Sequence, residues 1–87
     1  MSRKSKGINA ERELIHKFWA NGWAALRSAG SGSMRYPSPD IIAAKINRRI
    51  AIEAKVSAEE SKYLGKEEVE DLKKFSVLFN AEFFTLL

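Results

Sequence analysis

Residues 39–56 hold two short apolar runs on either side of a polar turn, and this stretch constrains the fold most strongly. The runs are Ile41–Ile46 and Ile50–Val56, and the turn is centred on Asn47-Arg48. Short runs rich in β-branched residues around such a turn are typical of a β-hairpin. Alternate residues of a strand point to the same face. We therefore expect one face of the second strand to enter the core, namely Ile50, Ile52, Ala54 and Val56.

The same hairpin carries charged residues that a strand interior disfavours: Asp40, Glu53 and Lys55. Asp40 opens the first strand, while Glu53 and Lys55 share one face of the second, so the two carboxylates can lie close together. A buried charge is costly unless it is paired or binds a metal, and Mg²⁺ prefers oxygen ligands. The pattern predicts that Asp40 and Glu53 bind Mg²⁺ and that Lys55 polarises a water beside it. A solvated hairpin face with an ordinary Glu–Lys pair is the alternative.

The composition indicates one small globular domain over residues 1–87, with 45% hydrophobic residues. No apolar run is long enough to span a bilayer and no signal peptide opens the chain, so we expect a soluble, cytoplasmic protein without a membrane partner. There is no cysteine and His16 is the only histidine, which argues against disulfides and zinc. The net charge of +4 and the pI of about 9.6 favour a polyanionic partner, although they say nothing of the fold.

Hydrophobic spacing predicts the remaining elements. We expect a helix over Ile8–Asn21, a short strand over Trp23–Arg27, a second helix from about Glu67 to Asn80 and a last strand over Glu82–Leu87. The apolar positions of the two helices are Leu14, Ile15, Phe18 and Trp19 in the first, and Val69, Leu72, Phe75 and Phe79 in the second. This order predicts an α/β fold in which a mixed sheet is flanked by helices, α-β-β-β-α-β.

Glu11 lies at the start of the apolar stripe of the first helix. A carboxylate directed inward is explained by a water on a metal or by a lysine that receives it. The alternative is a first-turn glutamate that complements the helix dipole. The acidic run of the second helix is predicted to be a solvated face of that kind rather than a metal site; it comprises Glu67, Glu68, Glu70 and Asp71.

Two basic or polar segments are candidates for phosphate contacts. Residues 1–6 are predicted to form a mobile basic arm, with Arg3, Lys4 and Lys6. Residues 28–38 have the composition of a loop that follows a DNA backbone through hydroxyls and Arg35, and a simple linker between strands is the alternative. The loop lacks the Gly-Lys-Ser/Thr ending of a phosphate-binding loop, so no nucleotide cofactor is expected.

Glu11, Asp40 and Glu53-Ala54-Lys55 together resemble the motif of the PD-(D/E)xK nuclease superfamily, with twelve residues between the two hairpin acids. The chain is more closely similar to the archaeal Holliday junction resolvases, and the resemblance covers nearly its whole length. The segments that carry it, besides the hairpin, are Ala10-Glu11-Arg12-Glu13, Asn21-Gly22-Trp23-Ala24, Arg27-Ser28-Ala29-Gly30-Ser31 and Tyr63-Leu64-Gly65-Lys66.

The resemblance implies a restriction-endonuclease-like fold and an Mg²⁺-dependent endonuclease, with Mn²⁺ as a substitute, that cuts DNA four-way junctions as a homodimer. It implies that Asp40, Glu53 and the Ala54 carbonyl bind the metal and that Glu11 joins them through water. Lys55 would orient the attacking water and stabilise the developing charge. Ser31 matches a serine used near the cleaved strand. The matching DNA-facing positions are Arg12, Arg27, Tyr63 and Lys66.

These resolvases continue beyond the strand at 82–87 with a further strand and helix, on which their dimer partly depends, whereas this sequence stops there. We therefore expect either a nuclease domain that lacks the usual C-terminal part or a dimer that is built differently. Three other functions stay open from the residues: a restriction or repair nuclease on the same fold, a catalytically silent DNA-binding module, and a basic interaction domain unrelated to nucleic acid.

Overall fold

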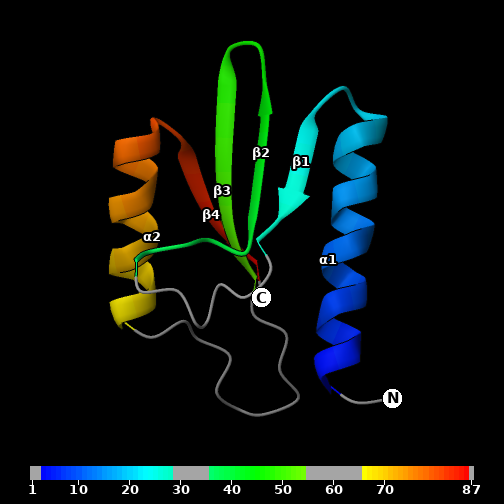
Figure 1. Ribbon diagram of the computed structural model, residues 1–87, viewed down its shortest axis with the longest axis horizontal. Coiled ribbons are helices and arrows are strands. Elements are labelled where there is room, and N and C mark those ends of the chain that lie inside the picture. Colours follow the sequence, from blue (N-terminus) through cyan, green and yellow to red (C-terminus); the bar gives the residue numbers. More distant parts are fainter. Residues whose placement is uncertain (1–2, 29–35, 55–65, 87) are drawn as a thin grey trace.

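The computed structural model describes residues 3–28, 36–54 and 66–86 of the chain, and the side chains of residues 9–28, 36–54 and 66–85. The elements follow the order α-β-β-β-α-β, which confirms the prediction (Figure 1). Their bounds are α1 Arg3–Ala20, β1 Ala24–Arg27, β2 Ile41–Lys45, β3 Arg48–Ala54, α2 Lys66–Phe79 and β4 Glu82–Leu86. No helix in these described ranges is long and apolar enough to cross a membrane.

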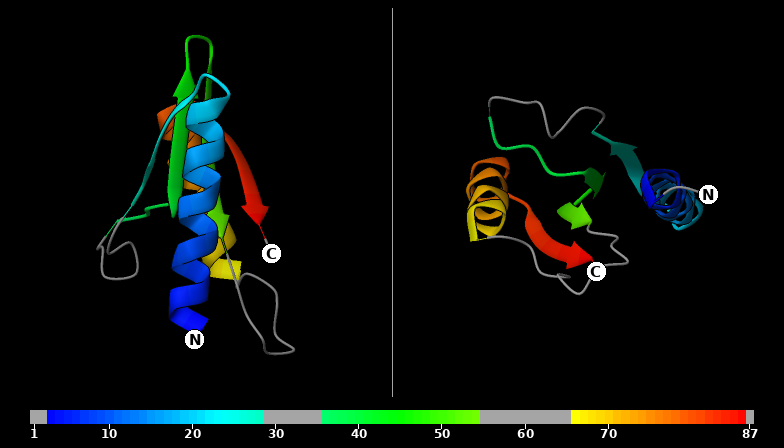
Figure 2. Two further views of the ribbon diagram at one scale, coloured as in Figure 1. Left: turned by 90° about the vertical axis from the view of Figure 1, so that its right-hand side faces the viewer. Right: turned by 90° about the horizontal axis from the view of Figure 1, so that it is seen from below.

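The four strands form one sheet in the order β1-β2-β3-β4. The first two pairs are antiparallel, and β4 joins β3 in parallel, so the sheet is mixed as predicted. Helix α1 packs against β1 and β2, and α2 packs against β3 and β4. Figure 2 shows the helices on opposite sides of the sheet, and this arrangement leaves the lower end of the hairpin between them.

The main core lies between α1 and the sheet. Its buried members are Trp23, Ala25, Ile41, Ala43, Ile50 and Ile52, with Leu14, Ile15 and Phe18 of α1 packed against them. The Phe18 and Trp23 rings meet edge to face, with 5.6 Å between their centroids. Trp19 was predicted to share this core, but it is 59% exposed. Its indole Nε1 instead donates a hydrogen bond to the Ala25 carbonyl oxygen at 3.0 Å, because β1 is an edge strand with free backbone groups.

The opposite face of the sheet is also covered. Ala51 of β3 is fully buried between Ile50 and Ile52, and Leu72 and Ser76 of α2 are buried as well. Three consecutive buried residues are typical of a strand that is covered on both faces. Glu53 continues the Ala51 face, so its carboxyl group is directed toward the α2 side rather than into open solvent.

Two predicted boundaries are wrong. Helix α1 begins at Arg3, so residues 3–6 are helical and not a mobile arm. Arginine and lysine favour a helix, and Gly7 alone costs only about 1 kcal/mol, which does not stop it. The hairpin turn lies at Ile46-Asn47, because Lys45 pairs with Arg48. The register that buries the apolar residues of both strands on one face decides this position.

Candidate acidic site at the open end of the hairpin

Asp40 and Glu53 lie side by side where β2 begins and β3 ends. Ile41 pairs with Ile52 in the antiparallel ladder, and the same register continued by one residue places Asp40 opposite Glu53. Directly opposite residues of antiparallel strands project to the same face. Asp40 Oδ2 also accepts a hydrogen bond from the Ala54 backbone N–H at 2.9 Å, which orients its carboxylate toward the end of β3.

The pKa of Glu53 is raised from 4.5 to about 8. Burial is the largest cause, followed by the negative charge of Asp40 and a hydrogen bond to its carboxylate; Glu68 and Glu11 add smaller repulsions. The Glu53 carboxyl group therefore keeps its proton at neutral pH unless a cation offsets the repulsion. The site therefore has the oxygen donors and the excess of negative charge that a hard divalent cation neutralises.

Glu68 belongs to this acidic surrounding, which corrects the prediction that the whole acidic run is solvated. Glu67, Glu70 and Asp71 are exposed, but Glu68 is partly buried and repels Glu53. A signal was present in the sequence. Glu68 lies four residues before Leu72 and eight before Ser76, and both of these are buried, so it belongs to the inward stripe of α2.

Glu11 projects inward from α1, as its place on the apolar stripe predicts, and its partner is Arg27. Glu11 Oε1 accepts a hydrogen bond from Arg27 Nε at 2.7 Å, and the two side chains are 18% and 31% exposed. Within the described residues, no three carboxylate or imidazole groups gather closely enough to hold a metal ion. The structure thus brings Asp40 and Glu53 together and leaves Glu11 on the arginine, with only a weaker repulsion toward Glu53.

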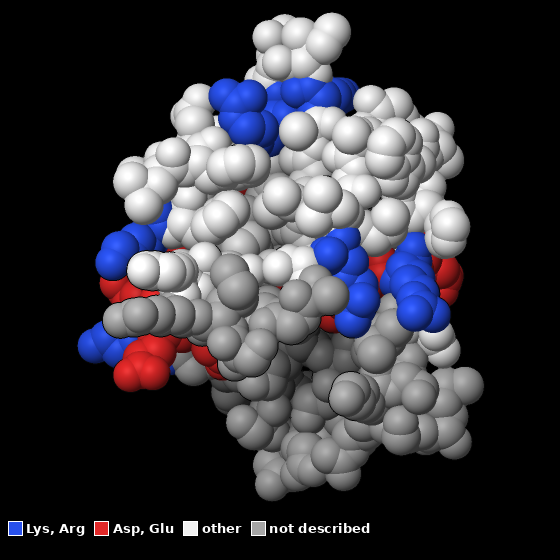
Figure 3. Space-filling model, viewed as in Figure 1, with Lys and Arg blue, Asp and Glu red and all other residues white. Residues whose placement is uncertain are grey.

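Several predicted site residues lie outside the described part of the chain: Ser31, Arg35, Lys55 and Tyr63. The side chains of Arg3, Lys4 and Lys6 also lie outside it. Arg12 and Lys66 are described and exposed. On the face seen in Figure 3, basic side chains gather over the tip of the hairpin. Further basic side chains lie next to acidic ones on the left and right sides of this face.

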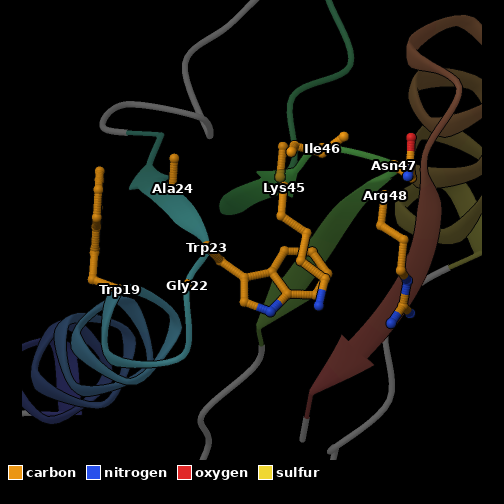
Figure 4. A pocket seen from close by; sticks show the side chains of 9 residues that line it. Trp19, Gly22, Trp23, Ala24, Lys45, Ile46, Asn47 and Arg48 are labelled. Atoms are coloured by element: carbon orange, nitrogen blue, oxygen red, sulfur yellow. The ribbon is translucent and has the colours of Figure 1, made fainter.

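A further pocket lies at the other end of the hairpin. This open pocket of about 740 Å³ is lined mainly by apolar surface, and Figure 4 shows Trp23 under the Lys45 side chain. The Lys45 ammonium is 4.8 Å from the centroid of the ring and the Arg48 guanidinium carbon is 5.4 Å from it. Arg48 also forms a two-pronged ion pair with Glu82. From Arg48 to Glu53 the strand rises about 17 Å, so this pocket is separate from the acidic site.

Comparisons with known proteins agree with this architecture. Residues 2–87 match the family described as archaeal Holliday junction resolvase (Hjc). The crossover junction endodeoxyribonuclease Hjc of Archaeoglobus fulgidus is 44% identical over 84 residues, which cover 97% of this chain and 62% of that protein. The Hjc of Sulfolobus acidocaldarius is 38% identical over 86 residues, which cover 97% of this chain and 60% of that one.

Among solved structures, the crystal structure of the Archaeoglobus fulgidus Hjc, described as a Holliday junction resolvase from an archaeal hyperthermophile, has a TM-score of 0.80 and 42% identity. The match covers 88% of this chain and 63% of that one. This chain therefore spans about three-fifths of the length of these relatives. Because the family match extends over almost every residue and the fold agrees, the chain belongs to the archaeal Holliday junction resolvase (Hjc) family.

Proposed function

We propose that this chain is a metal-dependent endonuclease domain that cleaves DNA at four-way junctions by phosphodiester hydrolysis. The observation that carries the proposal is the pairing of Asp40 with Glu53, in which the pKa of Glu53 is raised to about 8. A carboxyl pair under such mutual repulsion is suited to bind a divalent cation. Relatives named crossover junction endodeoxyribonuclease support the choice of substrate.

Asp40 and Glu53 would bind Mg²⁺, or Mn²⁺ as its substitute, and the Ala54 carbonyl oxygen is the third proposed ligand. When bound, the cation supplies Lewis-acid activation of water and neutralises charge on the phosphate. The Asp40 carboxylate is oriented for this role, because the Ala54 N–H donates a hydrogen bond to its Oδ2. Glu53 would bind such a cation in its deprotonated form. Lys55 and Ser31 keep their predicted roles, beside the attacking water and beside the cleaved strand.

The test uses a synthetic four-way junction and a linear duplex of the same sequence, each labelled at one 5′ end. We expect Mg²⁺-dependent nicks in the junction and little cutting of the duplex. Asp40→Asn and Glu53→Gln should each abolish nicking while leaving junction binding nearly intact, since binding depends on basic residues and phosphates. Asn retains an oxygen that accepts from the Ala54 N–H, so this variant removes the charge and keeps the hydrogen bond.

Each competing function has a different outcome. Equal cutting of the duplex would indicate a restriction or repair nuclease. Tight, salt-sensitive junction binding without any cutting would indicate a silent DNA-binding module. Binding that does not weaken as salt rises would point away from DNA altogether, because phosphate contacts release counterions. Full nicking activity in either carboxylate variant would refute the metal site.

We also propose that the chain acts as a homodimer in the cytoplasm, since paired nicks across a junction require two active sites. Exposed apolar side chains on the last turn of α2 support association: Val77 is 77%, Leu78 is 81% and Phe79 is 38% exposed. Sedimentation with and without a junction measures the number of subunits. A monomer in both conditions, with single unpaired nicks, would refute the dimer.

A further inference from the structure

Arg27 lies at the end of β1, where the resemblance implies a DNA-facing residue, yet its side chain is directed to α1. Every second residue of an extended chain points to the same side, so Trp23, Ala25 and Arg27 share one face of the sheet. Trp23 and Ala25 are buried against α1. Glu11 lies on the α1 stripe that faces them. The guanidinium of Arg27 and the carboxylate of Glu11 therefore meet at 2.7 Å between two packed elements, in a partly buried position.

The backbone beside Arg27 is tied to the acidic site. The Ser28 N–H donates to the Asp40 carbonyl oxygen at 2.7 Å, and the Ser28 and Ser38 hydroxyls lie 2.9 Å apart. Arg27 itself pairs with Ile41, the residue after Asp40. A continuous set of contacts thus runs from Glu11 through Arg27 and Ser28 to Asp40.

From this geometry we propose that Arg27 is a positioning residue, which fixes the Glu11 carboxylate between α1 and β1 at the open end of the hairpin, rather than a contact to DNA phosphates. The inference rests on the proposed nuclease function, because the position of Glu11 affects cleavage only if Glu11 acts in the same active site as Asp40 and Glu53. An arginine Nε–H bond of this length is charge-assisted and directional. The bond is made by Oε1 of Glu11.

A phosphate contact and a positioning role predict different measurements. Loss of one phosphate contact reduces the slope of log K against log salt by about 0.9 and weakens binding at low salt. Loss of a group that orients a metal-site carboxylate lowers metal affinity or activity by about 10–100-fold. We therefore expect Arg27→Gln to leave the salt slope of junction binding unchanged. The nicking rate at saturating junction should fall at least tenfold, and the Mg²⁺ dissociation constant, measured by calorimetry without DNA, should rise.

Matched variants separate the contributions. Lys17→Gln removes an exposed positive charge from α1, away from Glu11 and Arg27. It should leave the salt slope, the nicking rate and the Mg²⁺ dissociation constant unchanged. Arg12→Gln, at the exposed position next to Glu11, should lower the salt slope, as a phosphate contact does. Arg27→Lys keeps the charge without the guanidinium geometry and should recover part of the nicking rate. It also provides a folded variant if Arg27→Gln does not fold.

A double-mutant cycle completes the test. If Arg27 acts through Glu11, the variant with both Glu11→Gln and Arg27→Gln is no slower than Glu11→Gln alone. A reduced salt slope for Arg27→Gln with an unchanged rate at saturation would overturn the inference, and so would losses that multiply in the double variant. Wild-type protein that cuts no DNA would refute the proposed function as well, whereas cutting that is indifferent to Arg27 would refute this inference alone.

Discussion

Replacing Glu53 with glutamine removes a carboxyl group that the fold makes hard to ionise. The pKa of Glu53 is raised from 4.5 to about 8, because burial and the Asp40 charge disfavour its anion. Below pH 4.5 the folded and unfolded chains both keep the Glu53 proton. Between 4.5 and about 8 the unfolded chain loses it first, so the free energy of unfolding falls as the pH rises, and above 8 the loss is complete.

The magnitude follows from the shift. At 1.36 kcal/mol per pH unit, the difference between 4.5 and about 8 corresponds to roughly 5 kcal/mol. Glu53 is only half-buried, so solvent screening reduces this to about 2 kcal/mol. Glutamine does not titrate. In metal-free buffer, the unfolding free energy of Glu53→Gln should therefore exceed that of the wild type by about 2 kcal/mol more at pH 9 than at pH 4.5.

Urea unfolding followed by circular dichroism at pH 4.5, 6, 7.5 and 9, with EDTA present, measures this difference. Glu70→Gln is the control, because Glu70 is exposed and its replacement should change stability by less than about 0.5 kcal/mol at any of these pH values. A difference between Glu53→Gln and the wild type that does not vary with pH would refute the reasoning. Mg²⁺ added at pH 9 should restore stability to the wild type only, since ligand binding stabilises the state that holds it.

Three further substitutions test the fold by urea unfolding at neutral pH. Leu72→Ala empties a 3% exposed position between α2 and the sheet and should cost about 3 kcal/mol; a loss below about 1 kcal/mol would contradict the α2 packing. Ser76→Ala removes a buried hydroxyl with no hydrogen-bond partner among the described residues, so stability should stay equal or rise by up to about 1 kcal/mol, and a clear loss would reveal a partner. Gly22→Ala should cost about 1 kcal/mol from backbone strain alone, because Gly22 has φ 84° and nothing lies within 4 Å of an added Cβ; an unchanged midpoint would contradict that conformation.

Local patterns were sufficient for most of the fold. The hairpin, the helix with its stop at Gly22 and the end of α2 at Asn80, which has φ 57°, follow from residues close together in the sequence. Strand alternation predicted that Asp40 and Glu53 share one face, but the turn at Ile46-Asn47, one residue earlier than predicted, sets the register that places them directly opposite each other. The start of α1 was missed, since basic residues suit a helix as well as a mobile arm.

The sequence thus determined which elements form and which two carboxylates meet, because both depend on short-range geometry. The docking of the helices decided the rest. Arg27 contacts Glu11, sixteen residues earlier, and Glu68 of α2 lies near Glu53. Both contacts depend on which face of the sheet each helix covers and on where along the strands it packs. Side-chain alternation shows that Arg27 faces inward. It does not say which charge lies opposite, since that depends on how the apolar surfaces of separate elements pack together.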